Sequence, residues 1–167
     1  MESVSSPMVR ELSQKAVELL KERGLTVSCA ESCTGGLLSA ALTAIPGCSA
    51  VYCGGCVTYT DEVKHRVLGV RRKSLKLHSA VSPQVAAEMA VGMRERLGSD
   101  YALSVTGYAG PDGGSDKDPV GTVYIGISSC DHTKVVRMSD PPTATRDAVR
   151  EDAVARALRL LIEVAGA

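Results

Sequence analysis

The sequence predicts an α/β protein, a three-layer α/β/α sandwich around a mixed β-sheet. Amphipathic helical stretches alternate with short apolar runs along most of the chain, which favours strands joined by helices. Near the C-terminal end two strand-like runs follow each other across a short turn, which predicts an antiparallel hairpin. The 167 residues can bury one substantial core, so we expect a single domain over residues 1–167.

The first half of the chain alternates helix and strand. Pro7, after two serines, predicts a helix start. Gly54 and Gly55 predict a weak point or bulge within the second strand, and Thr60 or Asp61 caps the helix after it. In order, the expected elements are a helix ending at Gly24, a strand at 25–30, a helix of small residues at 37–44, a strand at 51–59 and a short helix reaching Leu68.

The second half adds a long helix, a buried strand and the hairpin. Ser82 and Pro83 form a strong helix start. A stripe that repeats every four residues belongs to the core: Val85, Met89, Met93 and Leu97. In order, the expected elements are an irregular basic turn at 71–78, a helix ending at Gly98, a strand at 101–106, a loop at 107–119, strands at 120–128 and 133–138, and a helix at 143–165.

Charge and composition exclude some classes of function. The 19 basic and 19 acidic residues balance, and the chain has no Phe, no Trp and only five Tyr. Because neither a basic surface nor aromatic stacking platforms are available, we expect no nucleic-acid partner. No basic and apolar leader opens the sequence and no apolar run is long enough to span a bilayer, so we expect a cytoplasmic protein with no membrane partner. The six cysteines then stay reduced, and we expect them to be buried.

Residues 31–36, Glu-Ser-Cys-Thr-Gly-Gly, follow the first strand and precede a helix. A turn of this kind offers backbone N–H groups to an anion or a developing oxyanion. Ser32 and Thr34 can cap the helix or act as nucleophile, and Gly35 and Gly36 allow close approach of a ligand. A simple capped turn is the alternative interpretation of the stretch.

Three blocks carry a resemblance to a known family. Residues 30–36 read Ala-Glu-Ser-Cys-Thr-Gly-Gly, residues 58–64 read Thr-Tyr-Thr-Asp-Glu-Val-Lys, and residues 106–114 read Thr-Gly-Tyr-Ala-Gly-Pro-Asp-Gly-Gly. In this order they resemble the C-terminal domain family of CinA, from about Leu12 to Val164. The resemblance implies the same α/β/α architecture, a nicotinamide-nucleotide amidase activity and the stand-alone form of the domain.

The ends of three expected strands would meet at one edge of the sheet, which brings Ser32, Tyr59 and Thr106 together. A serine nucleophile needs a base, and a buried lysine can serve when its neutral amine is available. Lys64 alone would most simply be an exposed helix lysine, but the resemblance favours it as the base. Tyr59 would relay a proton or orient Lys64, so we expect the catalytic residues Ser32, Lys64, Tyr59 and Thr106.

Cys33 is the competing nucleophile, because thiolates at helix N-termini are activated. It would normally need a histidine, and the three histidines fall in segments interpreted as surface. The family places Ser32 in this role, so we expect Cys33 to be a packing residue.

The loop at 107–114 is the second candidate binding element. Its glycines can form a turn or backbone nest for an anion, with a flexible surface loop as the alternative. Arg146 and Arg150 lie one turn apart on the last helix, where they either reach a phosphate or remain solvated. The expected substrate-binding residues are Glu31, Thr34, Gly35, Gly36, Gly107, Gly110, Gly113, Gly114 and Arg146.

Neither a metal nor another cofactor is expected. Cys53 and Cys56 have C-x-x-C spacing, but no second pair accompanies them, and alternation along a strand places them on opposite faces. Three aspartates at 112, 116 and 118 lack the glutamate that closes a calcium loop. The sequence contains neither Walker A nor G-x-G-x-x-G.

Two functions remain at this stage. The resemblance implies an amidohydrolase that converts nicotinamide mononucleotide to nicotinate mononucleotide and ammonia. The alternative is a catalytically silent nucleotide-binding module of the same fold. Thr58 and Tyr108 depart from the residues usual in the family, so pocket shape or substrate preference could differ. We expect a small pyridine nucleotide as partner and a homodimer as the assembly.

Overall fold

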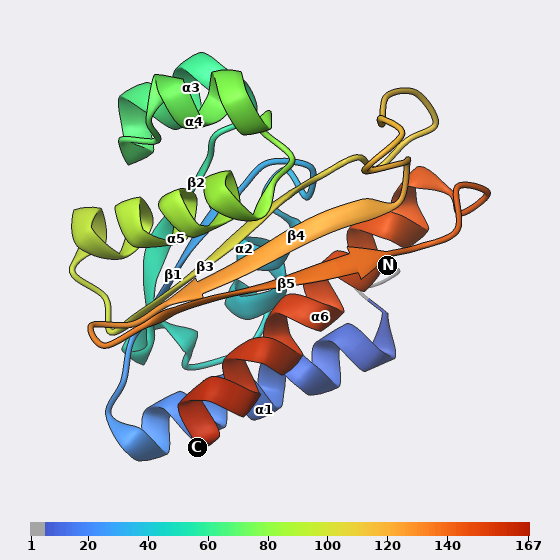
Figure 1. Ribbon diagram of the computed structural model, residues 1–167. Coiled ribbons are helices and arrows are strands. Elements are labelled where there is room, and N and C mark those ends of the chain that lie inside the picture. The colour runs from blue at the N-terminus through green and yellow to red at the C-terminus, as the bar shows by residue number, and fades with distance from the viewer. Residues whose placement is uncertain (1–5) are drawn as a thin grey trace.

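The computed structural model describes residues 6–167, so the expectations for residues 1–5 lie outside the described residues. A five-stranded sheet forms its centre (Figure 1). The strands are β1 (Val27–Glu31), β2 (Tyr52–Val57), β3 (Tyr101–Gly107), β4 (Thr122–Ser128) and β5 (Thr133–Ser139). Their order across the sheet is β2-β1-β3-β4-β5. The first three are parallel and the last two antiparallel, which confirms the predicted mixed sheet with its hairpin.

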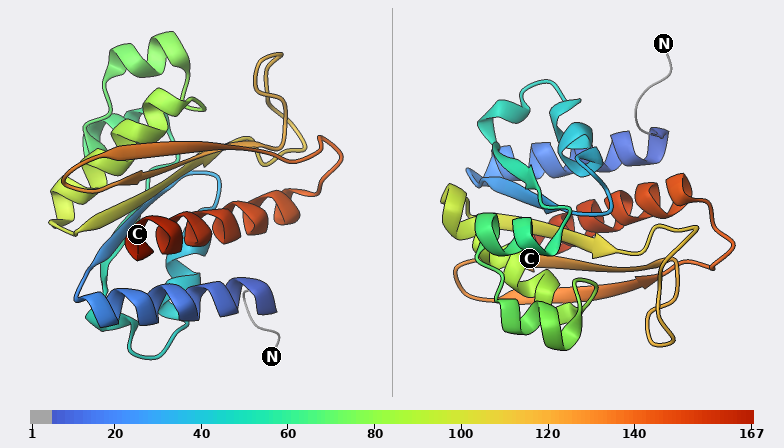
Figure 2. Two further views of the ribbon diagram at one scale, coloured as in Figure 1. Left: turned by 60° about the horizontal axis from the view of Figure 1, so that its bottom comes forward. Right: turned by 90° about the horizontal axis from the view of Figure 1, so that it is seen from above.

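Helices cover both faces of the sheet and give the three predicted layers (Figure 2). They are α1 (Pro7–Arg23), α2 (Leu37–Thr43), α3 (Asp61–Leu68), α4 (Arg72–His78), α5 (Pro83–Leu97) and α6 (Arg146–Gly166), with a 3₁₀ turn at Cys48–Ala50. On one face α5 crosses the strands, with α3 and α4 beside it. On the other face lie α2 and α6, and α1 packs against these two helices. The α/β/α class is therefore confirmed.

Two apolar clusters form most of the core, one on each face of the sheet. The larger lies between the sheet and α1, α2 and α6. Along α6 the small side chains of Ala153 and Ala157 are fully buried, which lets this helix approach the strands closely. Beneath α5, Met89 and Met93 fill the smaller cluster, as the predicted stripe requires. Leu97 was also assigned to the core, and this is wrong, because it is 40% exposed at the end of its helix.

Local signals explain why most helix bounds could be predicted. The side chains of Thr60 and Ser82 accept hydrogen bonds from the amides three residues later, at 3.3 Å in both cases, and so begin α3 and α5. Gly24 and Gly98 end α1 and α5 in the left-handed conformation that glycine adopts at little cost. The register of β1 against β2 skips Cys53, which confirms the irregularity predicted beside Gly54.

Three other expectations are wrong. Residues 71–78 form a helix, α4, rather than an irregular turn, because Leu75 is buried against α5 and Glu88 of α5 accepts a hydrogen bond from the Ser74 hydroxyl. The last helix begins at Arg146 instead of 143, where Thr145 caps it. The cysteines were all expected to be buried, but this is true only of Cys29 and Cys33. The other four are partly buried or exposed: Cys48, Cys53, Cys56 and Cys130.

Candidate active site

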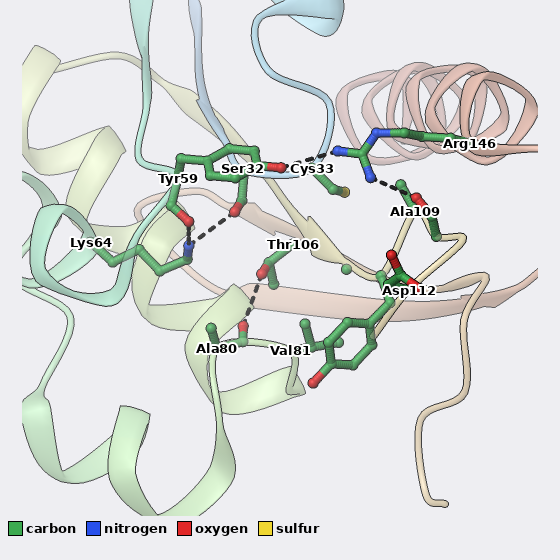
Figure 3. Close-up of a pocket in the computed structure, with 13 residues that line it drawn as sticks. Ser32, Cys33, Tyr59, Lys64, Ala80, Val81, Thr106, Ala109, Asp112 and Arg146 are labelled. Atoms are coloured by element: carbon green, nitrogen blue, oxygen red, sulfur yellow. Dashed lines mark hydrogen bonds between the residues drawn. The ribbon is translucent and has the colours of Figure 1, made fainter. Parts of the chain in front are cut away.

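A pocket of about 230 Å³ opens where the parallel strands β1 and β3 end (Figure 3). Side chains from distant parts of the chain line it, among them Ser32 after β1, Lys64 from α3, Thr106 of β3 and Arg146 of α6. The sheet edge therefore does collect the residues predicted to meet there. Tyr59 also lines the pocket, from the connection between β2 and α3.

Lys64 is the largest polar side chain in the interior, and only 1% of it is exposed. Its Nζ lies 3.0 Å from the Oγ of Ser32 and donates to the backbone carbonyls of Thr58 at 2.8 Å and Tyr59 at 3.3 Å. Helix α3 places it there, since the cap at Thr60 fixes the first turn on which Lys64 stands. No carboxylate of residues 6–167 forms a salt bridge with it.

Burial lowers the pKa of Lys64, and the neighbouring Asp61 carboxylate only partly opposes this. A neutral amine has two hydrogens and one lone pair. The carbonyls of Thr58 and Tyr59 can only accept, so they hold the two hydrogens. The lone pair then faces the hydroxyl of Ser32, which is the arrangement that a general base needs.

Glu31 takes a different position from the one we expected. Its fully buried carboxylate accepts hydrogen bonds from the amides of Gly36 and Leu38, both at 3.1 Å, and from the amide and hydroxyl of Ser39 at 2.8 and 2.6 Å. Glu31 thus caps α2 from within the protein and does not line the pocket. The amides at the start of α2 are occupied by this carboxylate, so the expectation that they receive an external anion is wrong.

Other amides of the turn remain available. Within residues 6–167, the amides of Cys33 and Thr34 donate no hydrogen bond. Their carbonyls accept from the guanidinium of Arg150, at 3.2 and 3.1 Å, which holds the peptide planes of the turn. Arg150 does not line the pocket, so these contacts make it a structural residue rather than a phosphate ligand.

The remaining predicted residues of this turn lie away from the pocket. Thr34 is fully buried, and its hydroxyl has no hydrogen-bond partner in the part of the chain that the structure describes. Gly35 and Gly36 have φ angles of +59° and +101°, which a residue with a side chain rarely adopts. They shape the turn, and a direct contact of any of these residues with substrate stays a prediction.

Cys33 lines the pocket beside Ser32 but is only 6% exposed. Burial raises the pKa of its thiol to about 11. The thiol is therefore protonated at neutral pH and is a poor nucleophile. No histidine is among the described residues that line the pocket, so Cys33 lacks the base that would activate it.

Tyr59 contacts Lys64 only through its backbone carbonyl. Its phenol oxygen instead accepts a hydrogen bond from Arg146 at 3.1 Å, and the side chain is 57% exposed. The second guanidinium nitrogen of Arg146 donates to the carbonyl of Gly110 at 2.7 Å. Arg146 thus joins the two sides of the pocket entrance (Figure 3), and a proton relay through the phenol of Tyr59 has no support in this geometry.

The loop after β3 forms the wall of the pocket opposite Lys64. Thr106 is buried and donates from Oγ1 to the carbonyl of Ala80 at 2.8 Å, which ties β3 to the segment before α5. Gly107 and Gly110 line the pocket as predicted. At Gly107 a side chain would overlap the carbonyl of Thr122, because β4 runs directly against it. Gly113 and Gly114 stand further out on the loop.

Six pocket residues were missing from the predicted set, among them Cys33, which was expected to pack in the core, and Ala109 of the loop after β3. Ala80 and Val81 precede α5 and carried no motif, while Tyr108 and Asp112 belong to the loop that the sequence singled out for its glycines. The clustering of Gly, Pro and Asp was the available signal for Asp112. Across residues 6–167 no group of three or more His, Cys, Asp or Glu side chains is arranged to hold a metal ion, and no described helix is long and apolar enough to cross a membrane.

The chain is similar to known proteins in both sequence and structure. Residues 9–165 match the family of the CinA C-terminal domain. The chain is 44% identical over 151 residues to the nicotinamide-nucleotide amidohydrolase PncC of Escherichia coli, covering 90% of this chain and 91% of that protein. It superimposes with a TM-score of 0.94 on the competence/damage inducible protein CihA from Agrobacterium tumefaciens, at 39% identity over 98% of this chain and 99% of that one.

Some relatives are much longer. A putative competence-damage inducible protein of Halothermothrix orenii is 54% identical over 114 residues, which are 68% of this chain but only 28% of that protein. Our chain therefore spans less than a third of the length of that relative.

Proposed function

The chain belongs to the CinA C-terminal domain family, and on that premise we propose that it hydrolyses the carboxamide of nicotinamide mononucleotide, with Ser32 as nucleophile and Lys64 as general base. The likeness to PncC over nearly the whole of both chains supports the substrate. One observation carries the mechanism: a buried lysine, with no carboxylate partner among residues 6–167, lies 3.0 Å from a serine hydroxyl inside a pocket.

The proposed reaction has two halves. The neutral amine of Lys64 takes the proton of the Ser32 hydroxyl as Oγ attacks the carboxamide carbon. The resulting ammonium returns the proton to the amide nitrogen, the C–N bond breaks, and ammonia leaves an acyl ester on Ser32. Lys64 then accepts a proton from the water that attacks the ester, and returns it to Ser32 Oγ as the C–O bond of the ester breaks, which releases nicotinate mononucleotide and restores the serine hydroxyl and the neutral amine.

The oxyanion formed in each half requires hydrogen-bond donors. The amides of Cys33 and Thr34 follow the nucleophile and donate to no group among residues 6–167. Arg150 binds the Cys33 carbonyl and so holds the peptide that carries the Thr34 amide, while the Gly35 amide donates to the Ser32 carbonyl at 3.0 Å and so holds the peptide that carries the Cys33 amide. Backbone donors fixed in this way stabilise developing charge without rearranging during the reaction.

The nucleotide phosphate is assigned to the entrance of the pocket. Arg146 stands there, and its partners in the described part of the chain are neutral groups, the carbonyl of Gly110 and the phenol of Tyr59. A phosphate competes well for a guanidinium held by such partners, because charge-assisted hydrogen bonds are about twice as strong as neutral ones. With the phosphate at Arg146, the nicotinamide extends inward towards Ser32.

The test is ammonia release by the purified protein from nicotinamide mononucleotide, with nicotinamide riboside as a second substrate. We expect stoichiometric ammonia and nicotinate mononucleotide, and a higher KM for the riboside with a smaller change in kcat, because phosphate contacts exist before the transition state. Binding of the nucleotide without any ammonia would instead identify the silent nucleotide-binding module. Equal KM values for the two substrates would contradict the assignment of Arg146 as the phosphate ligand.

A further inference from the structure

Asp112 is the only acidic side chain among the described residues that line the pocket. Within residues 6–167 its carboxylate forms neither a hydrogen bond nor a salt bridge, and in particular no ion pair with Arg146, which lines the same pocket. In Figure 3 it lies across the pocket from Lys64, on the side of Ala109 and Arg146. A free carboxylate therefore faces the space that a ligand would fill.

Tyr108 lines the same wall and brings an aromatic ring to it. Its backbone is fixed by two hydrogen bonds with the start of β4, from its amide to the carbonyl of Thr122 at 2.9 Å and from the amide of Gly121 to its carbonyl at 2.8 Å. The ring packs beside Val81. It also lies close to Gly113, because a Cβ atom added to that glycine would be only 3.3 Å from Cδ1 of the ring. The ring is thus held in place before any ligand arrives.

We propose that Tyr108 and Asp112 form a subsite for the positively charged pyridinium ring of the substrate, an inference that rests on the proposed function. At neutral pH, nicotinamide carries this charge only when its ring nitrogen is bonded to a sugar or alkyl group. The carboxamide to be attacked is attached to the same ring, so the charge must enter the pocket together with the reacting carbon. An aromatic ring and a carboxylate are the two protein groups that attract such a cation.

The distribution of charge in the pocket agrees with this subsite. The substrate has a phosphate at one end and a cationic ring at the other. Arg146 at the entrance matches the phosphate, and Asp112, on the same side of the pocket, is the only acidic side chain among the described lining residues that is available to the ring (Figure 3). Lys64 must be neutral to act as base, so it does not repel the ring in the reactive state. The subsite therefore selects N-ribosylated nicotinamide over free, uncharged nicotinamide.

The charge of the ring can be removed without changing the rest of the ligand. The dihydro form of nicotinamide mononucleotide keeps the phosphate, the ribose and the carboxamide, but its ring is neutral. Binding of both forms is measured by calorimetry to Ser32→Ala protein, which prevents turnover, and to the same protein with Asp112→Asn or Tyr108→Leu added. Asp116→Asn is the matched control, because Asp116 lies on the same loop but does not line the pocket.

We expect Asp112→Asn and Tyr108→Leu each to weaken binding of the oxidised nucleotide about five- to tenfold. Binding of the dihydro form should change less than about twofold, and Asp116→Asn should change neither. Equal weakening of both forms by Asp112→Asn would overturn the subsite and assign Asp112 to the ribose hydroxyls. No change in either form would also overturn it.

The outcome is separable from that of the proposed function. If wild-type protein releases ammonia while binding ignores the charge of the ring, only the subsite fails. If neither form binds and no ammonia appears, the proposed function and the subsite fail together.

Discussion

The amine of Lys64 is enclosed by three oxygen atoms, none of which carries a formal charge. An ammonium in this position loses hydration without gaining an ion pair, so burial favours the neutral form and lowers the pKa. A neutral lysine costs the fold less than a charged one and is also the form that can deprotonate Ser32. Burial thus explains both the lowered pKa of Lys64 and its proposed role as general base.

Replacement of Lys64 should separate activity from stability. We expect Lys64→Met and Lys64→Arg each to lower kcat/KM at least about 1,000-fold, because neither side chain can accept a proton. Lys64→Met should change the melting temperature little, since removal of a buried amine offsets the loss of a donor to the carbonyls of Thr58 and Tyr59. Near-normal turnover by Lys64→Arg would instead make Lys64 an electrostatic ligand.

The pH dependence follows from the direction of the shift. Because the pKa of Lys64 lies below the ordinary lysine value of about 10.4, the folded protein releases this proton at lower pH than the unfolded chain does. The contribution of Lys64 to the free energy of unfolding should therefore increase as the pH rises from the lowered pKa to about 10.4. kcat/KM should rise with pH and level off once the amine is neutral. A rate that falls over this range would contradict the assignment of Lys64 as base.

At the scale of single elements, the turn from β1 to α2 was predictable in its position but not in its internal contacts. A strand followed by small residues and two glycines indicated where Ser32 would stand. The sequence did not predict that Glu31 caps α2. Its carboxylate oxygens accept from amides five to eight residues later, and only the fold of the turn brings the carboxylate and these amides together. The same reasoning explains why Glu31 was assigned to the substrate.

Removal of this cap should destabilise the protein. For Glu31→Ala we expect a loss of about 2–3 kcal/mol in the free energy of unfolding, since several buried donors lose their acceptor. Chemical denaturation measures the loss. Glu11→Ala is the control, because Glu11 is exposed and contacts only Lys15 of its own helix, and it should leave stability nearly unchanged. Equal effects of the two variants would show that the Glu31 cap contributes little.

At the scale of the whole molecule, the sequence predicted the layers and the edge of the sheet where the site lies. The layers and the sheet edge follow from hydrophobic periodicity and from turn residues, and both of these signals are local in the sequence. The sequence did not predict α4, whose helical state depends on packing of Leu75 against α5. The sequence included Arg146 and not Arg150 in the expected site but could not show what either binds, because the backbone carbonyls that they contact lie 36 to 117 residues away in the chain.

The C-terminal helix should therefore influence catalysis through Arg150. We expect Arg150→Met to lower kcat about tenfold with little change in KM, because the guanidinium holds the turn that carries Ser32 but does not line the pocket. Arg156→Met on the same helix, whose partner is Asp152, should behave like wild type. Steady-state kinetics of both variants make the comparison. A rise in KM without loss of kcat would place Arg150 among the substrate ligands.

The identity of the nucleophile is tested most directly by the rate of ammonia release from nicotinamide mononucleotide by Ser32→Ala and Cys33→Ala proteins side by side. Both residues line the pocket, but only Ser32 has a base within hydrogen-bond distance, and the thiol of Cys33 has its pKa raised to about 11. We expect Ser32→Ala to lose at least about 1,000-fold in rate and Cys33→Ala to keep a rate close to wild type, with about 1 kcal/mol lost in stability. An active Ser32→Ala protein together with an inactive, folded Cys33→Ala protein would contradict the serine–lysine mechanism.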